Sequence, residues 1–182
     1  MKRTEVVCIL EGDFGSTDHI FASAFKKKLN PKWLRPTCKV RFEPCGSRNN
    51  VISRFSDELK SCIRRGSEST LIVLADVDDD CIDSEELKMK FWDKAKDAGV
   101  THEMFEKAVF IFPKDRIENW IQFLNTGVTN ENIEAPRVTR DEARAAASKL
   151  VEMYRNNSDT TNLPPSLTWS CQNWKKLTDR MD

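Results

Sequence analysis

The sequence predicts an α/β fold: a three-layer, Rossmann-like arrangement around a mostly parallel sheet of four strands, with a helical extension at the C-terminus. Two apolar runs, residues 6–10 and 71–75, are short, rich in β-branched residues and free of charge. Such runs are typical of strands that are buried on both faces of a parallel sheet. Segments with helical spacing alternate with the predicted strands, which requires parallel strands joined by right-handed crossovers.

The first strand is predicted at residues 5–10, and a loop follows it. Ser16 or Thr17 is placed to cap the next helix, in which apolar residues recur at helical spacing as far as Leu29. Residues 38–43 alternate between apolar and polar side chains. This alternation is typical of a strand nearer the edge of a sheet.

A second amphipathic helix is predicted between Ser47 and Gly66, and the third strand follows at residues 70–76. Ser84 is expected to cap a further helix, and the fourth strand is predicted at residues 107–112. Because the first and third strands are the two continuous apolar runs, we expect them to be neighbours in the sheet.

The pattern becomes helical after the fourth strand. A short helix is predicted from Ile117 to Leu124, a second from Asp141 to Tyr154 and a last one from about Ser166 to Leu177. The chain is therefore expected to consist of an α/β core at residues 1–126 and a helical extension at residues 127–182 that packs on it.

Composition narrows the classes of function. Lys and Arg together number 29, as do Asp and Glu, so the formal net charge is zero. Binding of nucleic acid by bulk charge is therefore excluded, and any such contact needs a local basic patch. The six cysteines form no Cys-x-x-Cys pair and there are two histidines, which disfavours a zinc site and indicates reduced thiols. The sequence predicts neither a signal peptide nor a membrane span, so a cytoplasmic protein is expected.

Carboxylates follow two of the predicted strands. Glu11 ends the first strand, and Asp76, Asp78, Asp79 and Asp80 follow the third. The carboxyl ends of parallel strands form the ligand crevice of such folds, so these acids are expected to converge. Gathered anions raise one another's pKa unless a cation lies between them, and oxygen ligands suit Mg²⁺ or Mn²⁺. The prediction is a metal site whose ligands are Glu11, Asp76, Asp78 and Asp80; the alternative is a solvated acidic turn.

The order of these motifs, Glu-Gly after strand one and Asp-x-Asp after strand three, resembles the TOPRIM family over roughly residues 5–124. Residues 112–120, Phe-Pro-Lys-Asp-Arg-Ile-Glu-Asn-Trp, are similar to the Arg-x-Ile-Glu-x-aromatic segment of OLD-family nucleases. Residues 46–49 and 163–167 are similar to segments of small stand-alone bacterial TOPRIM-like proteins. The resemblance implies a phosphodiester hydrolase that uses Mg²⁺ or Mn²⁺, acts on nucleic acid and works beside a partner ATPase in bacterial or phage defence.

Three features depart from the family pattern. Asp18 lies later than the usual Glu-Gly-x-x-Asp spacing would place it. Asp78 is followed by Asp79-Asp80-Cys81, whereas topoisomerase-type chains continue into Arg-Glu-Gly-Glu. The single tyrosine, Tyr154, lies in the predicted helical extension. Topoisomerase and primase activities are therefore not expected.

In the hydrolase hypothesis, the catalytic carboxylates are Glu11, Asp76, Asp78 and Glu118. Glu118 would complete a second metal position, or it would instead pair with Lys114 or Arg116 at a helix N-terminus. Phosphate would be held by three cationic residues, because Arg binds phosphate through paired hydrogen bonds. These are Arg48, Lys114 and Arg116, and the alternative for each of them is a solvated surface position.

Two other functions compete with the hydrolase. The first is a non-enzymatic TOPRIM-like module that binds a partner protein or nucleic acid. The second is a phospho-receiver, which would use Lys114 but would need an acidic pair after the first strand. His19 is interpreted as a helix-surface residue rather than a general base, and His102 is expected in a loop. Trp120, Trp169 and Trp174 are interpreted as core residues rather than platforms for base stacking.

Overall fold

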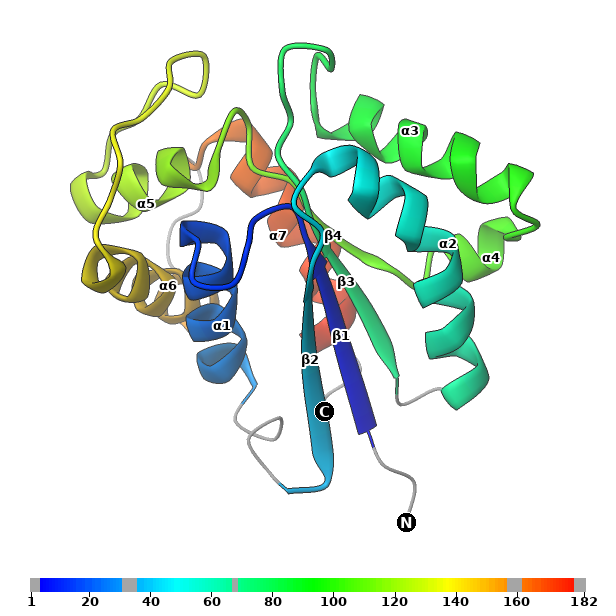
Figure 1. The fold of residues 1–182 in the computed structure, drawn as a ribbon. Coiled ribbons are helices and arrows are strands. Elements are labelled where there is room, and N and C mark those ends of the chain that lie inside the picture. Colours follow the sequence, from blue (N-terminus) through cyan, green and yellow to red (C-terminus); the bar gives the residue numbers. More distant parts are fainter. Residues whose placement is uncertain (1–3, 31–35, 67–68, 157–161, 179–182) are drawn as a thin grey trace.

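The computed structural model describes residues 4–30, 36–66, 69–156 and 162–178. Its four strands form one sheet in the order β2-β1-β3-β4, and every neighbouring pair is parallel (Figure 1). The strands are β1 (Thr4–Leu10), β2 (Cys38–Pro44), β3 (Thr70–Leu74) and β4 (Val109–Ile111). The predicted α/β class, the parallel pairing and the adjacency of the first and third strands are confirmed.

Helices cover both faces of the sheet and complete a Rossmann-like three-layer fold (Figure 1). One face packs against α1, α5, α6 and α7, and the other packs against α2, α3 and α4. Their bounds are α1 (Thr17–Leu29), α2 (Arg48–Arg65), α3 (Ser84–Asp97), α4 (His102–Phe105), α5 (Ile117–Thr126), α6 (Arg140–Arg155) and α7 (Pro165–Thr178).

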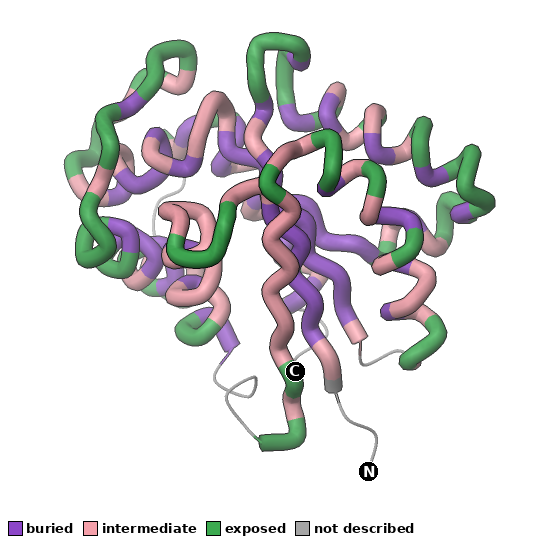
Figure 2. The backbone as a smooth tube through the Cα atoms, in the orientation of Figure 1, coloured by how far each residue is buried: buried purple, intermediate pink, exposed green. Residues whose placement is uncertain are grey.

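The apolar runs are buried on both faces because successive side chains of a strand point to opposite sides of the sheet. In β1, Val6, Cys8 and Leu10 face the α1 side, and Val7 and Ile9 face the α2 side. Figure 2 shows the centre of the sheet buried and β2, at the edge, only partly covered. Within β2 the apolar residues Val40 and Phe42 pack against the α1 side, and the alternating Arg41 and Glu43 pair with each other.

The other edge of the sheet is covered by α7. The backbone N–H of Phe112 donates a hydrogen bond to Ser170 Oγ at 3.0 Å, and the N–H of Lys114 donates to Ser166 Oγ at 3.1 Å. Two serines of α7 thus satisfy backbone groups that a further strand would otherwise pair. The segment 162–178 is in this way joined to the sheet by hydrogen bonds as well as by apolar packing.

Most helix starts agree with the prediction, and one does not. Ser16 caps α1 and Ser47 caps α2, each accepting a hydrogen bond from a backbone N–H three residues later. The prediction that Ser84 caps α3 is wrong: Asp83 is the cap, and its side chain accepts from the N–H of Glu86. Ser84 is instead the first helical residue, and its buried hydroxyl donates to the carbonyl of Phe112 at 3.3 Å.

The loop predicted around His102 is also wrong, because this residue begins the short helix α4. A four-residue helix makes too few turns to show a hydrophobic period in the sequence. Thr101 caps it by accepting a hydrogen bond from the N–H of Met104. The helix places Phe105 in the core beside Phe55 and Phe110.

The tryptophans of the extension and of α5 serve the core. Trp120 and Trp174 are fully buried in the same cluster, and Trp174 contacts Phe25 of α1 with ring centroids 4.8 Å apart. Trp169 is partly buried and stacks on Phe112, and its indole N–H donates to Glu85 Oε2 at 3.0 Å. The interpretation of Trp120 and Trp174 as core residues is confirmed.

The six cysteines are unpaired thiols, and Cys8, Cys62 and Cys81 are buried. Burial raises the pKa of Cys8 to about 12, so it serves as a small apolar side chain rather than a nucleophile. In the part of the chain that the structure describes, no helix is both long and apolar enough to span a membrane.

Replacing Trp174 by alanine should test whether α7 is part of the core. Removing a fully buried tryptophan leaves a cavity, and we expect the free energy of unfolding to fall by about 3–5 kcal/mol in urea titrations. Trp92→Ala is the matched control, since Trp92 is only partly buried, on the other face of the sheet, and should cost less. Equal losses in the two variants would contradict this assignment.

Candidate functional site

The candidate site lies where β1 and β3 end side by side. Leu10 pairs with Leu74 in the parallel register, and the N–H of Glu11 donates to the carbonyl of Leu74 at 3.1 Å. The Glu11 carboxylate then accepts a hydrogen bond from the N–H of Asp76 at 3.2 Å. The first two acids predicted from the sequence are therefore joined directly, across 65 positions of the chain.

Asp76 is the innermost acid of the site. Its Oδ1 atom is buried and has no hydrogen-bond partner in the structure. Burial raises the pKa of Asp76 well above its ordinary value, and the negative charges of Asp18, Glu11, Asp78 and Glu118 raise it further. These carboxylates thus lie close enough to act on one another through space.

Asp18 joins the site from the first turn of α1. Burial raises its pKa from 3.8 to about 6, with further contributions from Glu118 and Glu11 and an opposing one from Arg116. Gly12 makes this approach possible: a Cβ atom there would lie 2.8 Å from Asp18 Oδ2 and 2.4 Å from Ser16 Oγ. A larger residue at position 12 would require the side chains of Ser16 and Asp18 to shift.

Four carboxylates, which we call the acidic cluster, therefore gather at the ends of β1 and β3: Glu11, Asp18, Asp76 and Glu118. Glu118 comes from the first turn of α5. In the described chain it forms no ion pair with Lys114 or Arg116, which was the alternative role for this residue. Sequence reasoning did not assign Asp18 to the site; the available signal was its position shortly after the Glu11-Gly12 turn.

The outer acids of the Asp76–Asp80 loop are neutralised by cations. Arg48 NH1 lies 3.1 Å from Asp78 Oδ2, and Arg48 NH2 lies 2.6 Å from Asp80 Oδ1. Lys90 Nζ adds a contact of 2.7 Å to the other oxygen of Asp80. Hydrogen bonds from Lys90 and Arg48 lower the pKa of Asp80 to about 2. Asp80 therefore lies in an ion-pair network at the rim, outside the acidic cluster.

The three residues predicted to hold phosphate all have partners within the protein. Arg48 binds Asp78 and Asp80 as described, and its NH1 also donates to the Asp76 carbonyl at 3.3 Å. Lys114 Nζ donates to the carbonyl of Cys81 at 3.0 Å, and Arg116 forms an ion pair with Glu134. All three cationic groups are thus engaged by oxygen atoms of the protein.

The loop after β4 carries a second unusual acid. Asp115 has a φ of 63°, the left-handed region that a non-glycine residue rarely adopts, and its Oδ2 atom is buried without a partner. A parallel bridge between Val77 and Lys114 holds this loop against the one after β3. The negative charge of Asp115 contributes to raising the pKa of Asp78, after the larger effects of burial and Asp80. Backbone strain of this kind clusters at functional sites.

The donors of the acidic cluster are of the right chemistry for Mg²⁺ or Mn²⁺, since all are carboxylate oxygens and one of them is buried and unpaired. Their arrangement is looser than a finished site. Over the described ranges, no three Asp, Glu, His or Cys side chains are grouped closely enough to hold a metal ion together. Binding of a metal here would therefore require at least one of these carboxylates to move toward the others.

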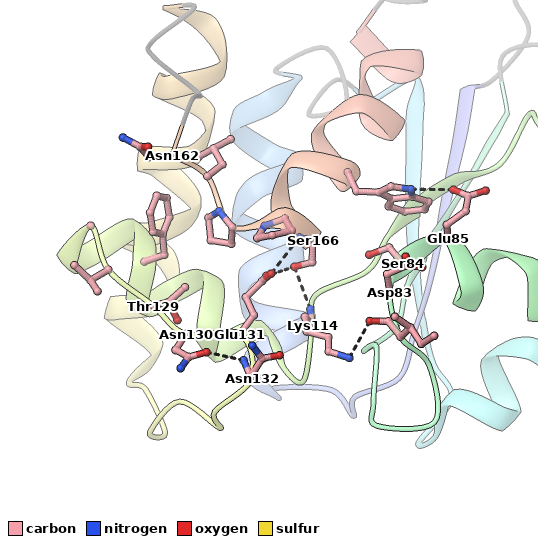
Figure 3. A pocket seen from close by; sticks show the side chains of 18 residues that line it. Asp83, Ser84, Glu85, Lys114, Thr129, Asn130, Glu131, Asn132, Asn162 and Ser166 are labelled. Carbon is pink, nitrogen blue, oxygen red and sulfur yellow. Dashed lines mark hydrogen bonds between the residues drawn. The ribbon is translucent and has the colours of Figure 1, made fainter.

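A large cleft of about 880 Å³ lies beside the site but contains none of the acidic cluster. Figure 3 shows Glu131 and Ser166 turned toward each other in this cleft, with Lys114 between them and the loop that begins α3. The N–H of Ser166 donates to Glu131 Oε2 at 3.2 Å, so a protein carboxylate already occupies the N-terminal end of α7. Ser166 and Lys114, which line the cleft, thus already form hydrogen bonds with other groups of the protein.

Comparisons with known proteins assign no relatives: no protein-family model matches the chain, and neither a curated protein nor a solved structure matches it.

Replacing Asp18 by asparagine should stabilise the protein above about pH 6. The native state keeps a proton on Asp18 between about pH 4 and 6, where the unfolded chain has released it, so the free energy of unfolding falls as pH rises through this window. We expect the variant to gain on the order of 2 kcal/mol near pH 8 and little near pH 3, because one pKa unit corresponds to about 1.4 kcal/mol.

The measurement is urea unfolding at several pH values in the presence of a chelator. Asp57→Asn, which removes an exposed carboxylate from α2, is the control and should leave the pH profile of the wild type unchanged. If the gain in the free energy of unfolding for Asp18→Asn did not depend on pH, the charge of this carboxylate would not be what destabilises the native state.

Proposed function

We propose that the protein is a phosphodiester hydrolase that depends on Mg²⁺ or Mn²⁺ and acts on nucleic acid. The observation that supports this most is the convergence of Glu11, Asp18, Asp76 and Glu118 at the carboxyl edge of the sheet, with Asp76 Oδ1 buried and unpaired. A buried carboxylate oxygen without a partner is costly, and so is a group of like charges. A divalent cation would relieve both costs at once.

In this proposal Glu11 and Asp76 would hold the metal, together with Asp78 once its ion pair with Arg48 opened. The bound ion would neutralise the charge that develops on the phosphoryl oxygens and orient the attacking water. A carboxylate of the cluster that does not hold the metal, Asp18 or Glu118, would accept the proton of that water. The resemblance of the Glu11-Gly12 and Asp76-x-Asp78 motifs to the TOPRIM family supports the same chemistry.

Arg48 would have two roles in turn. It now holds Asp78 and Asp80 with the two nitrogens of one guanidinium group. Such a group binds phosphate with the same paired geometry. If Asp78 turned toward a metal, Arg48 NH1 would lose this carboxylate, keep its hydrogen bond to the Asp76 carbonyl, and be able to take up a phosphate oxygen. Metal binding and substrate binding would then be coupled through one side chain.

A second candidate function is a module that binds a partner, such as an ATPase in a defence system, with the acids retained for structure. The observation that favours it is the engagement of Arg48, Lys114 and Arg116 by protein groups. These contacts, together with the loose spacing of the acids, are what we expect if the acidic loop has a structural role. The experiments below distinguish the two functions.

The first test is metal binding. Replacing Asp76 by asparagine should weaken Mn²⁺ binding in calorimetry by at least about tenfold, since even outer-sphere contacts of metal sites contribute this much. Asp57→Asn removes an equal charge from α2, away from the cluster, and should bind Mn²⁺ as the wild type does. If Asp76→Asn binds Mn²⁺ as tightly as the wild type does, the acidic loop is a solvated turn and not a metal site.

The second test is hydrolysis of labelled DNA and RNA, single- and double-stranded, with Mg²⁺ and Mn²⁺. Glu11→Gln and Asp78→Asn should each lower kcat by on the order of 100-fold while the circular dichroism spectrum stays that of the wild type, because the charge that stabilises the transition state is removed. KM should change little, since the cationic residues remain.

Asp57→Asn again serves as the control and should keep full activity. If the wild type cuts none of these substrates, alone or with the product of a neighbouring gene, yet binds that product tightly, the partner-binding function replaces the hydrolase.

A further inference from the structure

A groove of about 530 Å³ runs between α1 and α6, away from the acidic cluster. Its lining is basic: it includes three cationic residues and no Asp or Glu. The polar residues are His19, Ser23, Lys27 and Lys28 of α1 with Arg144 and Ser148 of α6. We call this feature the basic groove.

The charges of the basic groove are mostly uncompensated. Lys27 and Lys28 are exposed, and in the described parts of the chain neither ammonium group lies within ion-pair distance of a carboxylate. Arg144 pairs with Asp141 at 3.2 Å, but both side chains are largely exposed, so water screens this pair. In a chain with no net charge, this local excess of positive charge is the kind of patch that attracts a polyanion.

One end of the basic groove lies near the loop that follows Glu11. Helices α1 and α6 lie side by side (Figure 1). At their N-terminal ends Arg140 lies against the loop after Glu11, since a Cβ at Gly15 would be 3.9 Å from its NH2. At their C-terminal ends Arg155 donates to the carbonyl of Lys28. From His19 to Lys28 the groove covers about 13 Å, roughly four nucleotides at a stacked spacing of about 3.4 Å.

An exposed aromatic ring stands at the head of the basic groove. Phe14 is 69% exposed in the loop between Glu11 and α1. Its ring meets the edge of His19, with centroids 5.3 Å apart, and the N–H of Gly15 donates to His19 Nδ1 at 3.1 Å. Burial and Lys26 lower the pKa of His19, so the neutral imidazole holds this loop in place. The ring of Phe14 is thus presented to solvent on a tethered loop.

We propose that Phe14 and the basic groove bind a single-stranded nucleic acid, with a base stacked on Phe14 and the backbone phosphates along Lys27, Lys28 and Arg144. Aromatic stacking beside a positively charged track is the usual chemistry of single-strand binding. A base within a duplex has no free face to offer Phe14, so duplexes are disfavoured. The inference deepens the proposed function by naming the strand on which the acidic cluster would act.

The test measures binding in a chelator, so that it does not depend on hydrolysis. Fluorescence anisotropy follows a labelled single-stranded oligonucleotide of about 12 nucleotides, as DNA and as RNA, and the matching duplex. The variants are Phe14→Ala and the double variant Lys27→Gln with Lys28→Gln. Their controls are Ile82→Ala, another exposed apolar loop residue, and Lys39→Gln with Lys94→Gln, which removes two exposed charges elsewhere.

Phe14→Ala should weaken single-strand binding by about 5- to 100-fold, the range of one base–aromatic stack, with an unchanged salt dependence. The double lysine variant should reduce the slope of log K against log salt by about 1.4, because each phosphate contact to a single strand contributes about 0.7. Both controls should bind as the wild type does. Binding of DNA alone, or of RNA alone, supports the inference and identifies the strand.

The inference is overturned if no oligonucleotide binds at low salt, if Phe14→Ala and the double lysine variant bind like their controls, or if the duplex binds as tightly as the single strand. Its failure is distinguishable from that of the proposed function. If the double lysine variant hydrolyses the substrate with an unchanged KM, the basic groove does not bind the substrate, but the proposed hydrolase function still holds. If the protein binds the oligonucleotide through these residues but shows no metal-dependent cleavage, the proposed hydrolase function is wrong and the binding role of the basic groove still holds.

Discussion

The parallel pairing of β1 with β3 is the constraint on which the candidate site depends. It places Glu11 and Asp76 at the same edge of the sheet, where the carboxylate of one accepts a hydrogen bond from the backbone N–H of the other. Antiparallel strands would have carried these acids to opposite ends of the molecule. The pairing is stable because both faces of β1 and β3 are buried by helices, which is the condition under which parallel sheets form.

The acids around this edge divide into an inner group without ion pairs in the described chain and an outer group that pairs with cations. Burial and neighbouring negative charges raise the pKa values of Glu11, Asp18 and Asp76 in the inner group. The outer group is neutralised by Arg48 and Lys90. A fold retains uncompensated buried charge at a cost to its stability, and such charge is concentrated at sites of function. A bound cation would therefore stabilise the inner group more than the outer group.

The helices after β4 contribute to the core and to the surface chemistry together. Trp174 of α7 fills the space beside α1, while Ser166 and Ser170 complete the hydrogen bonds at the β4 edge. Ala143, Ala146 and Ala147 of α6 are buried in the same cluster, and small side chains of this kind let two helices approach closely. That approach brings Arg144 beside Lys27 and Lys28, so the basic groove is a consequence of the packing that stabilises the fold.

The strands, their parallel class, the adjacency of β1 and β3 and the caps at Ser16 and Ser47 follow from local patterns, because hydrophobic period and capping are properties of neighbouring residues. The same patterns predict Glu11 and Asp76 at one edge. Tertiary contacts add Asp18 to these acids, choose between the two roles predicted for Glu118, pair Arg48 with Asp78 and Asp80, and form the basic groove between α1 and α6. These outcomes are contacts between segments far apart in the chain. The choice among several carboxylates for one arginine depends on how the helices pack, which no local pattern encodes.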